Sequence, residues 1–331
     1  MAERKATILV GDALERLRAL PAESVQCVVT SPPYWGLRDY GHDGQIGMEA
    51  TPADYVARLV AVFAELRRVL RADGVVWLNL GDTYITRRGG GIGKNSCLNG
   101  SARPHVAYRK ASARRRCDRA ATGLAQKQLV GIPWRVVFAL QDDGWWLRSE
   151  VIWHKNNATP ESAQDRPARS HEHVFLLSRS KRYRYDVRAV RQPYSPATLK
   201  EFGKPYAGED RKDYVGSWAQ RPASVKARTV ESLERNGGAN LRSVWTMPTA
   251  QWTGEHTSTF PVSLPDLCIR AGSAAGDTVL DPFCGSGTTG IAALRLGRQF
   301  VGIELNAKHA ATARDRIAED APLYNRAEVR A

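Results

Sequence analysis

The sequence predicts an α/β protein with a mostly parallel sheet, and three observations lead to this class. Short apolar runs alternate with segments of helical apolar spacing, which is the element order of a parallel sheet. Gly and Asp bound several of these runs, as expected where strands end in turns. Two short motifs rich in Gly or Pro directly follow such runs, and ligands of open α/β sheets bind at the carboxyl ends of the strands.

The first 85 residues show this alternation most clearly. Two apolar runs end in Gly-Asp, and a long segment carries apolar residues at helical spacing. We expect the Asp73-Gly74 pair to end the long helix. The predicted strands are 7–10, 25–29 and 75–80, and the predicted helices are 13–20 and 53–70.

The centre of the chain contains two stretches without either periodicity. Residues 86–127 are rich in Gly and Arg, and loops this long are usually functional or disordered. Residues 186–243 are mixed and basic, and we expect an inserted recognition region there. Regular elements are predicted around them: a helix at 129–141, strands at 145–154 and 171–178, a helix at 264–270, a strand at 278–280, a helix at 288–296, a strand at 300–303, and a helix at 307–318 before a polar tail.

A Gly-rich turn at 281–289 (DPFCGSGTT) follows a predicted strand and opens a helix. Together with Gly290 it matches GxGxxG, and Glu304 ends the next strand, so two kinds of nucleoside cofactor fit. A NAD-type dehydrogenase is one alternative. S-adenosylmethionine is favoured, because Asp281 suits a cationic amino acid better than a pyrophosphate. In addition, few residues remain after Glu304 for the further βα units of a dinucleotide domain.

The motif 30–34 (TSPPY) follows another predicted strand. The two prolines fix φ and lack a backbone N–H. We expect the carbonyls of the Ser and of both Pro residues to be free hydrogen-bond acceptors that are held rigidly. The Ser31 hydroxyl and the Pro32 carbonyl could hold both N–H bonds of an exocyclic amine, while Tyr34 offers a face for stacking a base. The amine could then attack a sulfonium methyl, with catalysis through orientation and hydrogen bonding. The bulky Trp35 is compatible with a small pocket for the base.

The 331-residue chain has a formal net charge of +14, and a protein this basic usually meets a polyanion such as nucleic acid. Its five cysteines form no CxxC pair, which argues for a reducing compartment. Cys97, His105 and Cys117 have a spacing that fits no common site, so we expect no metal. There is no signal-peptide pattern and no apolar run of about 18 residues. We therefore expect a soluble cytoplasmic protein without membrane contact.

Together, the two motifs resemble those of the bacterial and phage DNA amino-methyltransferases, in the beta class, whose catalytic motif precedes the cofactor motif. The resemblance covers most of the chain and implies functional residues. The implied catalytic residues are Ser31, Pro32, Pro33 and Tyr34. The implied cofactor-binding residues are Asp12 beside the adenine, Thr30, Phe260 and Pro261 near the methionine part, Asp281, Phe283, Cys284, Gly285, Ser286, Gly287, Thr288, and Glu304 on the ribose.

The resemblance also implies a fold and a reaction. The fold is a circularly permuted Rossmann-like sheet whose first two strands are 278–280 and 300–303. The reaction is transfer of a methyl group from S-adenosylmethionine to a base flipped out of double-stranded DNA. Ser31 heads the tetrapeptide in the form that accompanies cytosine-N4 methylation. Adenine-N6 methylation is the nearest alternative, and an inactive DNA-binding protein on this fold is another. Cytosine-C5 methylation is disfavoured, because the chain has no Pro-Cys dipeptide.

The same resemblance divides the chain into a catalytic half (1–185), a target-recognition region (186–243) and a cofactor-binding half (244–331). Basic side chains in the long loop and near the recognition region are candidates for DNA contact; a solvated loop without a specific role is the alternative. These candidates are Arg87, Arg88, Arg114, Arg115, Arg116, Arg182, Arg184 and Arg188. A homodimer and a cognate restriction endonuclease in the same system are compatible with this family.

Overall fold

The computed structural model describes residues 4–37, 41–42, 44–85, 122–202, 235–250 and 260–330. Contacts within the chain divide it into two units, of which one comprises Met1–Tyr185 and Ser243–Ala331 and the other Asp186–Arg242. The second unit covers nearly the same stretch for which the sequence predicts an inserted region. Its described residues include the short helix α5 (Pro196–Phe202) and a bridge between Gln192 and Ala239.

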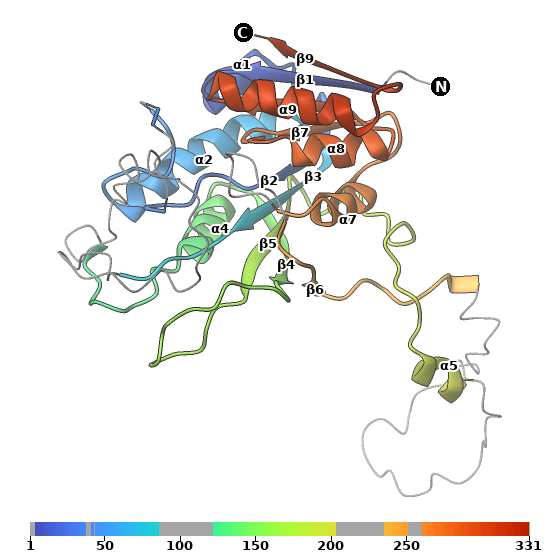
Figure 1. Cartoon of the computed structure of the whole chain (residues 1–331), viewed down its shortest axis with the longest axis horizontal. Coiled ribbons are helices and arrows are strands. Elements are labelled where there is room, and N and C mark those ends of the chain that lie inside the picture. The colour runs from blue at the N-terminus through green and yellow to red at the C-terminus, as the bar shows by residue number, and fades with distance from the viewer. Residues whose placement is uncertain are drawn as a thin grey trace, which may run out of the picture. The chain divides into compact units, whose positions relative to one another are not determined.

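The first unit is built on one sheet, whose strands within the described residues follow the order β6-β4-β5-β3-β2-β7-β8-β1-β9 (Figure 1). The central strands are parallel, whereas β5 pairs antiparallel with both β3 and β4. The strands are β1 (Arg4–Val10), β2 (Val25–Thr30), β3 (Leu70–Leu80), β4 (Trp146–His154), β5 (His171–Ser178), β6 (Val244–Thr246), β7 (Thr278–Asp281), β8 (Gln299–Glu304) and β9 (Asn325–Arg330).

Helices cover both faces of this sheet. On one face, the side chains of Val76 and Leu78 pack with three helices into a core cluster. The alternate residue Trp77 points to the opposite face, where Gly272 of another helix approaches it. The first group of helices is α1 (Ala13–Ala19), α2 (Pro52–Val69) and α4 (Ile132–Asp142). The second, packed in series, is α7 (Ser263–Gly272), α8 (Thr288–Arg295) and α9 (Ala307–Asp320).

The strand order confirms the circularly permuted Rossmann-like fold. Counted from β7, the strands β7, β8, β1, β2 and β3 lie in the order 3-2-1-4-5, which is the doubly wound arrangement. The chain therefore enters this arrangement at its third strand and reaches the first two only near its C-terminus. The order reverses between β7 and β2, and a crevice for ligands is expected at the carboxyl ends of these two strands.

Local sequence explains where several helices begin. Thr51 caps α2 by accepting from the N–H of Asp54, and Pro52 occupies the first turn, where a missing N–H has no cost. The Asp82 carboxylate accepts from the N–H groups of Gly131 and Ile132 and so caps α4 from the end of β3. This cap ties the start of α4 to the carboxyl end of the sheet.

Two expectations about element ends were wrong. The helix α2 ends at Val69, and the Asp73-Gly74 pair lies inside β3 rather than ending the helix. A Cβ on Gly74 would lie 2.6 Å from Leu70 Cγ, so glycine lets the strand continue over that side chain. The polar tail forms the edge strand β9, where Glu328 pairs with Lys5 at 3.2 Å. Charged residues suit an edge strand because they hinder pairing with other chains.

No helix among the described residues is long and apolar enough to cross a membrane. Nearly all of the Gly- and Arg-rich stretch lies outside these residues, and so do Arg87, Arg88, Arg114, Arg115, Arg116, Cys97, His105 and Cys117.

Candidate active site

A cavity of about 470 Å³ lies at the carboxyl ends of the central strands, at the crevice expected from the strand order. Both sequence motifs contribute to its wall, although they are about 250 positions apart in the chain. The predicted site residues that line it are Asp12, Ser31, Pro32, Pro33, Tyr34, Phe260, Asp281, Phe283, Cys284, Gly285, Ser286, Thr288 and Glu304.

Three predicted cofactor residues, Thr30, Pro261 and Gly287, are not part of this wall. Thr30 is fully buried behind it, and Gly287 takes a φ of 80° at the start of α8. A Cβ on Gly287 would lie 3.0 Å from the Cβ of Ala313, so this glycine allows α8 and α9 to pack closely. Asp12 lines the cavity and also caps α1 through the N–H of Leu14.

Asp281 is a buried carboxylate at the end of β7. One of its oxygens accepts from the Thr30 hydroxyl at 2.7 Å, and the other accepts from the Thr289 hydroxyl at 2.7 Å. The N–H of Phe283 adds a third bond at 3.1 Å. Burial raises the pKa of Asp281 to about 6, against the opposing effect of these hydrogen bonds. The carboxylate is therefore rigidly held and gains from a cation placed beside it.

Glu304, at the end of β8, is held against the Gly-rich turn. Its carboxylate accepts from the N–H of Gly285 at 3.0 Å and from the N–H of Asn306 at 2.9 Å. A carboxylate has about four acceptor positions, so hydroxyl groups can still bind it. The Ser286 Oγ is buried and has no hydrogen-bond partner among the described residues, although Ser286 lines the cavity. These acceptors and this unpartnered hydroxyl fit a ligand with a ribose and an amino-acid end.

The Ser-Pro-Pro-Tyr segment forms the adjoining wall. The Pro33 carbonyl accepts from the Tyr55 hydroxyl at 3.0 Å, so it is not the free acceptor that the sequence suggested. The Tyr34 ring lies against the backbone of Gly81, where a Cβ would be 2.5 Å from the ring atom Cε2. Glycine at position 81 is thus what leaves room for this ring. Trp35 is buried in the core and does not line the cavity, so it does not shape a pocket for a base.

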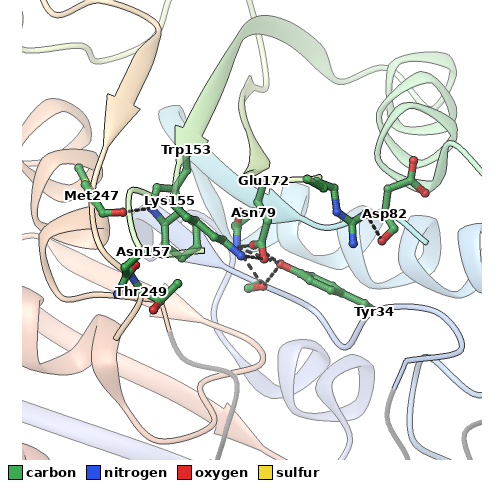
Figure 2. Close-up of polar contacts among 11 residues, drawn as sticks. Tyr34, Asn79, Asp82, Trp153, Lys155, Asn157, Glu172, Met247 and Thr249 are labelled. Carbon is green, nitrogen blue, oxygen red and sulfur yellow. Dashed lines mark hydrogen bonds and ion pairs between the residues drawn. The ribbon is translucent and has the colours of Figure 1, made fainter. Parts of the chain in front are cut away.

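The Tyr34 hydroxyl is the centre of a polar cluster that the sequence motifs did not reveal (Figure 2). It donates to Glu172 Oε2 at 2.6 Å and accepts from Asn79 Nδ2 at 3.1 Å. Ser31 Oγ donates to the same hydroxyl at 3.3 Å. Lys155 forms an ion pair with the other oxygen of Glu172. Asn79, Glu172 and Lys155 all line the cavity.

Only one of these three additional residues carried a sequence signal. Asn79 interrupts an otherwise apolar run in a predicted buried strand, and a polar residue there needs a reason. Lys155 follows the end of β4, and Glu172 is the second residue of β5, where nothing in the local pattern marks them.

The segment after β6 is joined to the end of β4 beside this cluster, as Figure 2 shows. The Trp153 indole N–H donates to the Met247 carbonyl at 3.2 Å, and Asn157 Oδ1 accepts from the N–H of Thr249 at 2.7 Å. Lys155 Nζ lies 4.8 Å from the centre of the Trp153 ring. These contacts hold the wall formed by Trp153, Lys155 and Thr249.

Neither of the candidates for DNA contact described in the first unit, Arg182 and Arg184, lines the cavity. Arg182 is exposed, and the N–H of Arg184 donates to the Asp73 carbonyl near the amino end of β3, opposite to the end that bears the cavity. Arg188 is exposed in the second unit. Among the described residues no group of three or more His, Cys, Asp or Glu side chains is placed to hold a metal ion.

Comparison with known proteins identifies the class of this site. A family model for DNA methylase matches residues 25–315. The type II methyltransferase M.XycI of Xanthomonas campestris pv. cyanopsidis is 44% identical, over 95% of this chain and 88% of that protein. The type II methyltransferase M.SmaI of Serratia marcescens is 42% identical, over 95% of this chain and 91% of that protein. The chain therefore belongs to the DNA methylase family and is a DNA amino-methyltransferase.

Solved structures show the same fold. The PvuII DNA methyltransferase (cytosine-N4-specific) superimposes with a TM-score of 0.60 at 17% identity, over 99% of this chain and 95% of that one. A putative DNA modification methylase of Thermus thermophilus, in complex with S-adenosyl-L-methionine, gives a TM-score of 0.58 at 24% identity, over 98% and 100% of the two chains. At these identities the likeness concerns the fold.

Proposed function

We propose that this protein transfers a methyl group from S-adenosylmethionine to the exocyclic N4 of a cytosine flipped out of double-stranded DNA. The observation that carries the proposal is that one cavity is lined both by the Gly-rich turn with Glu304 and by the Ser31 hydroxyl. A nucleoside-type ligand and a planar base held in this cavity would be neighbours. No residue needs to attack the base, because its own amine is the nucleophile.

The residues of β7 and β8 would hold the cofactor, which supplies an electrophilic methyl group on a sulfonium centre. Glu304 has free acceptor positions for the two ribose hydroxyls, and Asp281 is a buried carboxylate suited to an ammonium group. Phe260 and Phe283 line the same cavity and offer apolar contacts. Two further predicted binding residues act from outside the wall, since Thr30 orients Asp281 and Gly287 sets the packing of α8.

The Ser-Pro-Pro-Tyr wall would hold the base. The Ser31 hydroxyl and the Pro32 carbonyl can each accept one N–H of an exocyclic amine, which leaves the nitrogen lone pair directed away from both. The Tyr34 ring offers a stacking face. Catalysis is then orientation of the amine together with hydrogen bonds that strengthen as positive charge develops on the nitrogen. Cytosine is preferred to adenine because the family resemblance associates Ser at the head of the tetrapeptide, here Ser31, with cytosine-N4 methylation.

Other parts of the chain would bind the DNA. In this proposal residues 1–185 and 244–331 are the catalytic and cofactor-binding halves, and residues 186–243 read the target sequence. The basic stretch 86–127 contacts the phosphate backbone; deletion of its residues 87–119 should reduce the slope of log affinity against log salt by about one unit per lost phosphate contact. An unaltered slope would make this stretch a bystander. A homodimer and a companion restriction endonuclease belong to the same proposal.

The decisive experiment identifies the methylated base. Unmethylated genomic DNA is incubated with the protein and labelled cofactor, digested to nucleosides and analysed by mass, with Ser31→Ala as the inactive control. Label in N4-methyl-2′-deoxycytidine is expected, and Ser31→Ala should lower transfer by roughly 100- to 1000-fold. Label in N6-methyl-2′-deoxyadenosine alone would replace cytosine by adenine in the proposal. Label in 5-methylcytosine would overturn the mechanism, because attack by an amine cannot methylate a ring carbon.

A further inference from the structure

The hydrogen bonds of the polar cluster around Tyr34 can form in only one donor-to-acceptor direction. The reason is that the Glu172 carboxylate can only accept and the N–H₂ group of Asn79 can only donate. Glu172 Oε2 accepts hydrogen bonds from the Tyr34 hydroxyl at 2.6 Å and from Asn79 Nδ2 at 2.9 Å. An ionised carboxylate can only accept. The Asn79 amide must therefore present its N–H₂ group toward Glu172, since its oxygen would repel the carboxylate. Both interactions oblige the Tyr34 hydroxyl to donate to Glu172.

This direction is passed on to Ser31. Once its proton is committed to Glu172, the Tyr34 oxygen is an acceptor, and it receives Asn79 Nδ2 at 3.1 Å and Ser31 Oγ at 3.3 Å. The Ser31 proton is thus directed at Tyr34, away from any bound base. Asn79 Nδ2 also approaches Ser31 Oγ, at 3.4 Å. The lone pair that remains on Ser31 can accept an N–H from the cavity, whereas it repels a carbonyl oxygen.

Lys155 keeps Glu172, the final acceptor of these hydrogen bonds, ionised. Burial alone would raise the pKa of Glu172, but the charge and hydrogen bond of Lys155, with the bonds from Tyr34 and Asn79, outweigh burial and hold it below its ordinary value. A protonated Glu172 could donate to Tyr34 and reverse the direction of the hydrogen bonds from Ser31 through Tyr34 to Glu172. The ion pair with Lys155 on the neighbouring strand end prevents this reversal.

We propose that Glu172 is a positioning residue that acts through Tyr34 to make Ser31 a hydrogen-bond acceptor for the target amine. The inference rests on the proposed function and deepens it. The site then selects a base with an amine at the reacting position and disfavours one with a carbonyl there, such as thymine. In this arrangement Glu172 acts on the base through Tyr34 and Ser31, and Lys155 acts through Glu172.

The variant Glu172→Gln tests the direction of these hydrogen bonds, because Gln has almost the same side-chain shape as Glu. Lys155 can only donate, so it would take the amide oxygen of Gln and turn the amide N–H₂ toward Tyr34. The Tyr34 hydroxyl would then donate to Ser31, and the Ser31 proton would meet the substrate amine. We expect the single-turnover rate of methyl transfer to fall on the order of 100-fold while the affinity for S-adenosylmethionine is unchanged.

The double variant Tyr34→Phe/Glu172→Gln separates positioning from a structural role. A phenylalanine ring has no hydroxyl and cannot donate a hydrogen bond to Ser31. Ser31 is therefore again free to accept an N–H of the amine. We expect the double variant to be faster than Glu172→Gln and as fast as Tyr34→Phe alone. The matched control is Glu150→Gln, which removes a carboxylate from a 2.6 Å contact with His173 on the same strand pair, outside the cavity wall. It should transfer methyl groups like the unaltered protein.

Losses that multiply in the double variant would overturn the inference, as would a Glu172→Gln rate equal to that of Glu150→Gln. If Glu172→Gln does not fold, as judged by thermal melting, Tyr34→Phe still decides. It must lose less rate than Ser31→Ala, because it leaves Ser31 able to accept, and an equal or larger loss contradicts the inference. Failure of the proposed function is separate from these outcomes, because the unaltered protein would then methylate no exocyclic amine.

Discussion

The Thr30 hydroxyl donates a hydrogen bond of 2.7 Å to the Asp281 carboxylate and so joins the two motifs of the site across 251 positions of sequence. Both groups are buried, and their strands β2 and β7 are neighbours in the sheet. The bond lies at the point where the strand order reverses. It therefore couples the wall proposed to hold the base to the wall proposed to hold the cofactor.

The variant Thr30→Val should weaken this junction. It keeps the side-chain shape but removes one of the two donors to Asp281 Oδ1, which retains the N–H of Phe283, and a lost hydrogen bond to a charged group costs about 1.5–3 kcal/mol. We expect a drop of that size in the free energy of unfolding, measured in urea. Thr312→Val is the control, since it removes only an exposed bond to the Lys308 carbonyl. Equal stability of the two variants would contradict the coupling.

Cofactor binding should depend on pH through Asp281. Its pKa is raised to about 6 by burial, and an ammonium group needs the ionised form. Affinity for S-adenosylmethionine should therefore fall about tenfold for each pH unit below 6, whereas an ordinary carboxylate would titrate about two units lower. Calorimetry between pH 5 and 8 measures this. In Asp281→Asn the binding should be weaker and its pH profile flat; a profile that persists would show that Asp281 is not the titrating group.

Acid unfolding through Asp281 does not explain such a loss. Because the folded-state pKa is raised, this group's contribution to stability is fully present below its unfolded value, near pH 4, and is lost as the pH rises through about 6. Asp281 therefore favours the folded state at the pH values where binding is expected to weaken. Circular dichroism at each pH checks that the protein remains folded.

The variant Glu304→Gln should weaken cofactor binding by roughly 1.5–3 kcal/mol, the range for hydrogen bonds to a charged group. Gln retains one acceptor for the N–H groups of the turn but loses the charge and the other acceptor oxygen. Calorimetry with S-adenosylmethionine measures the effect, with the exposed Glu319→Gln on α9 as control. Unchanged affinity in Glu304→Gln would remove the ribose role from this residue, and a gain of NADH binding would revive the dehydrogenase alternative.

The variant Gly81→Ala should impair methyl transfer without affecting the cofactor side. Its Cβ would lie 2.5 Å from Tyr34 Cε2, closer than carbon atoms can pack, so the ring must move. A displacement near 1 Å at a reacting centre can lower the rate on the order of 100-fold. Single-turnover kinetics would show this loss, and calorimetry should show unchanged cofactor affinity. A normal rate would mean that the position of the Tyr34 ring is unimportant for transfer.

The sequence by itself determined the fold class and the two motifs that line the cavity, and its family resemblance implied the permuted strand order. Strands, helices and the Gly-rich turn depend on periodicity and on turn chemistry, which are local properties. For this reason most elements lie where the sequence predicts them. Two of the errors concern residues whose surroundings are not local: Trp35 packs into the core, and the polar tail pairs as an edge strand with β1.

Only the tertiary structure decided how the site is completed. Glu172 reaches the Tyr34 hydroxyl, 138 positions away, because β5 pairs antiparallel with β3 in a register that sets Leu80 opposite His173. Strand pairing depends on packing between distant segments, and no local pattern encodes a register of this kind. The motifs therefore identify which chemistry the protein contains, whereas the pairing of strands decides which charged groups orient it.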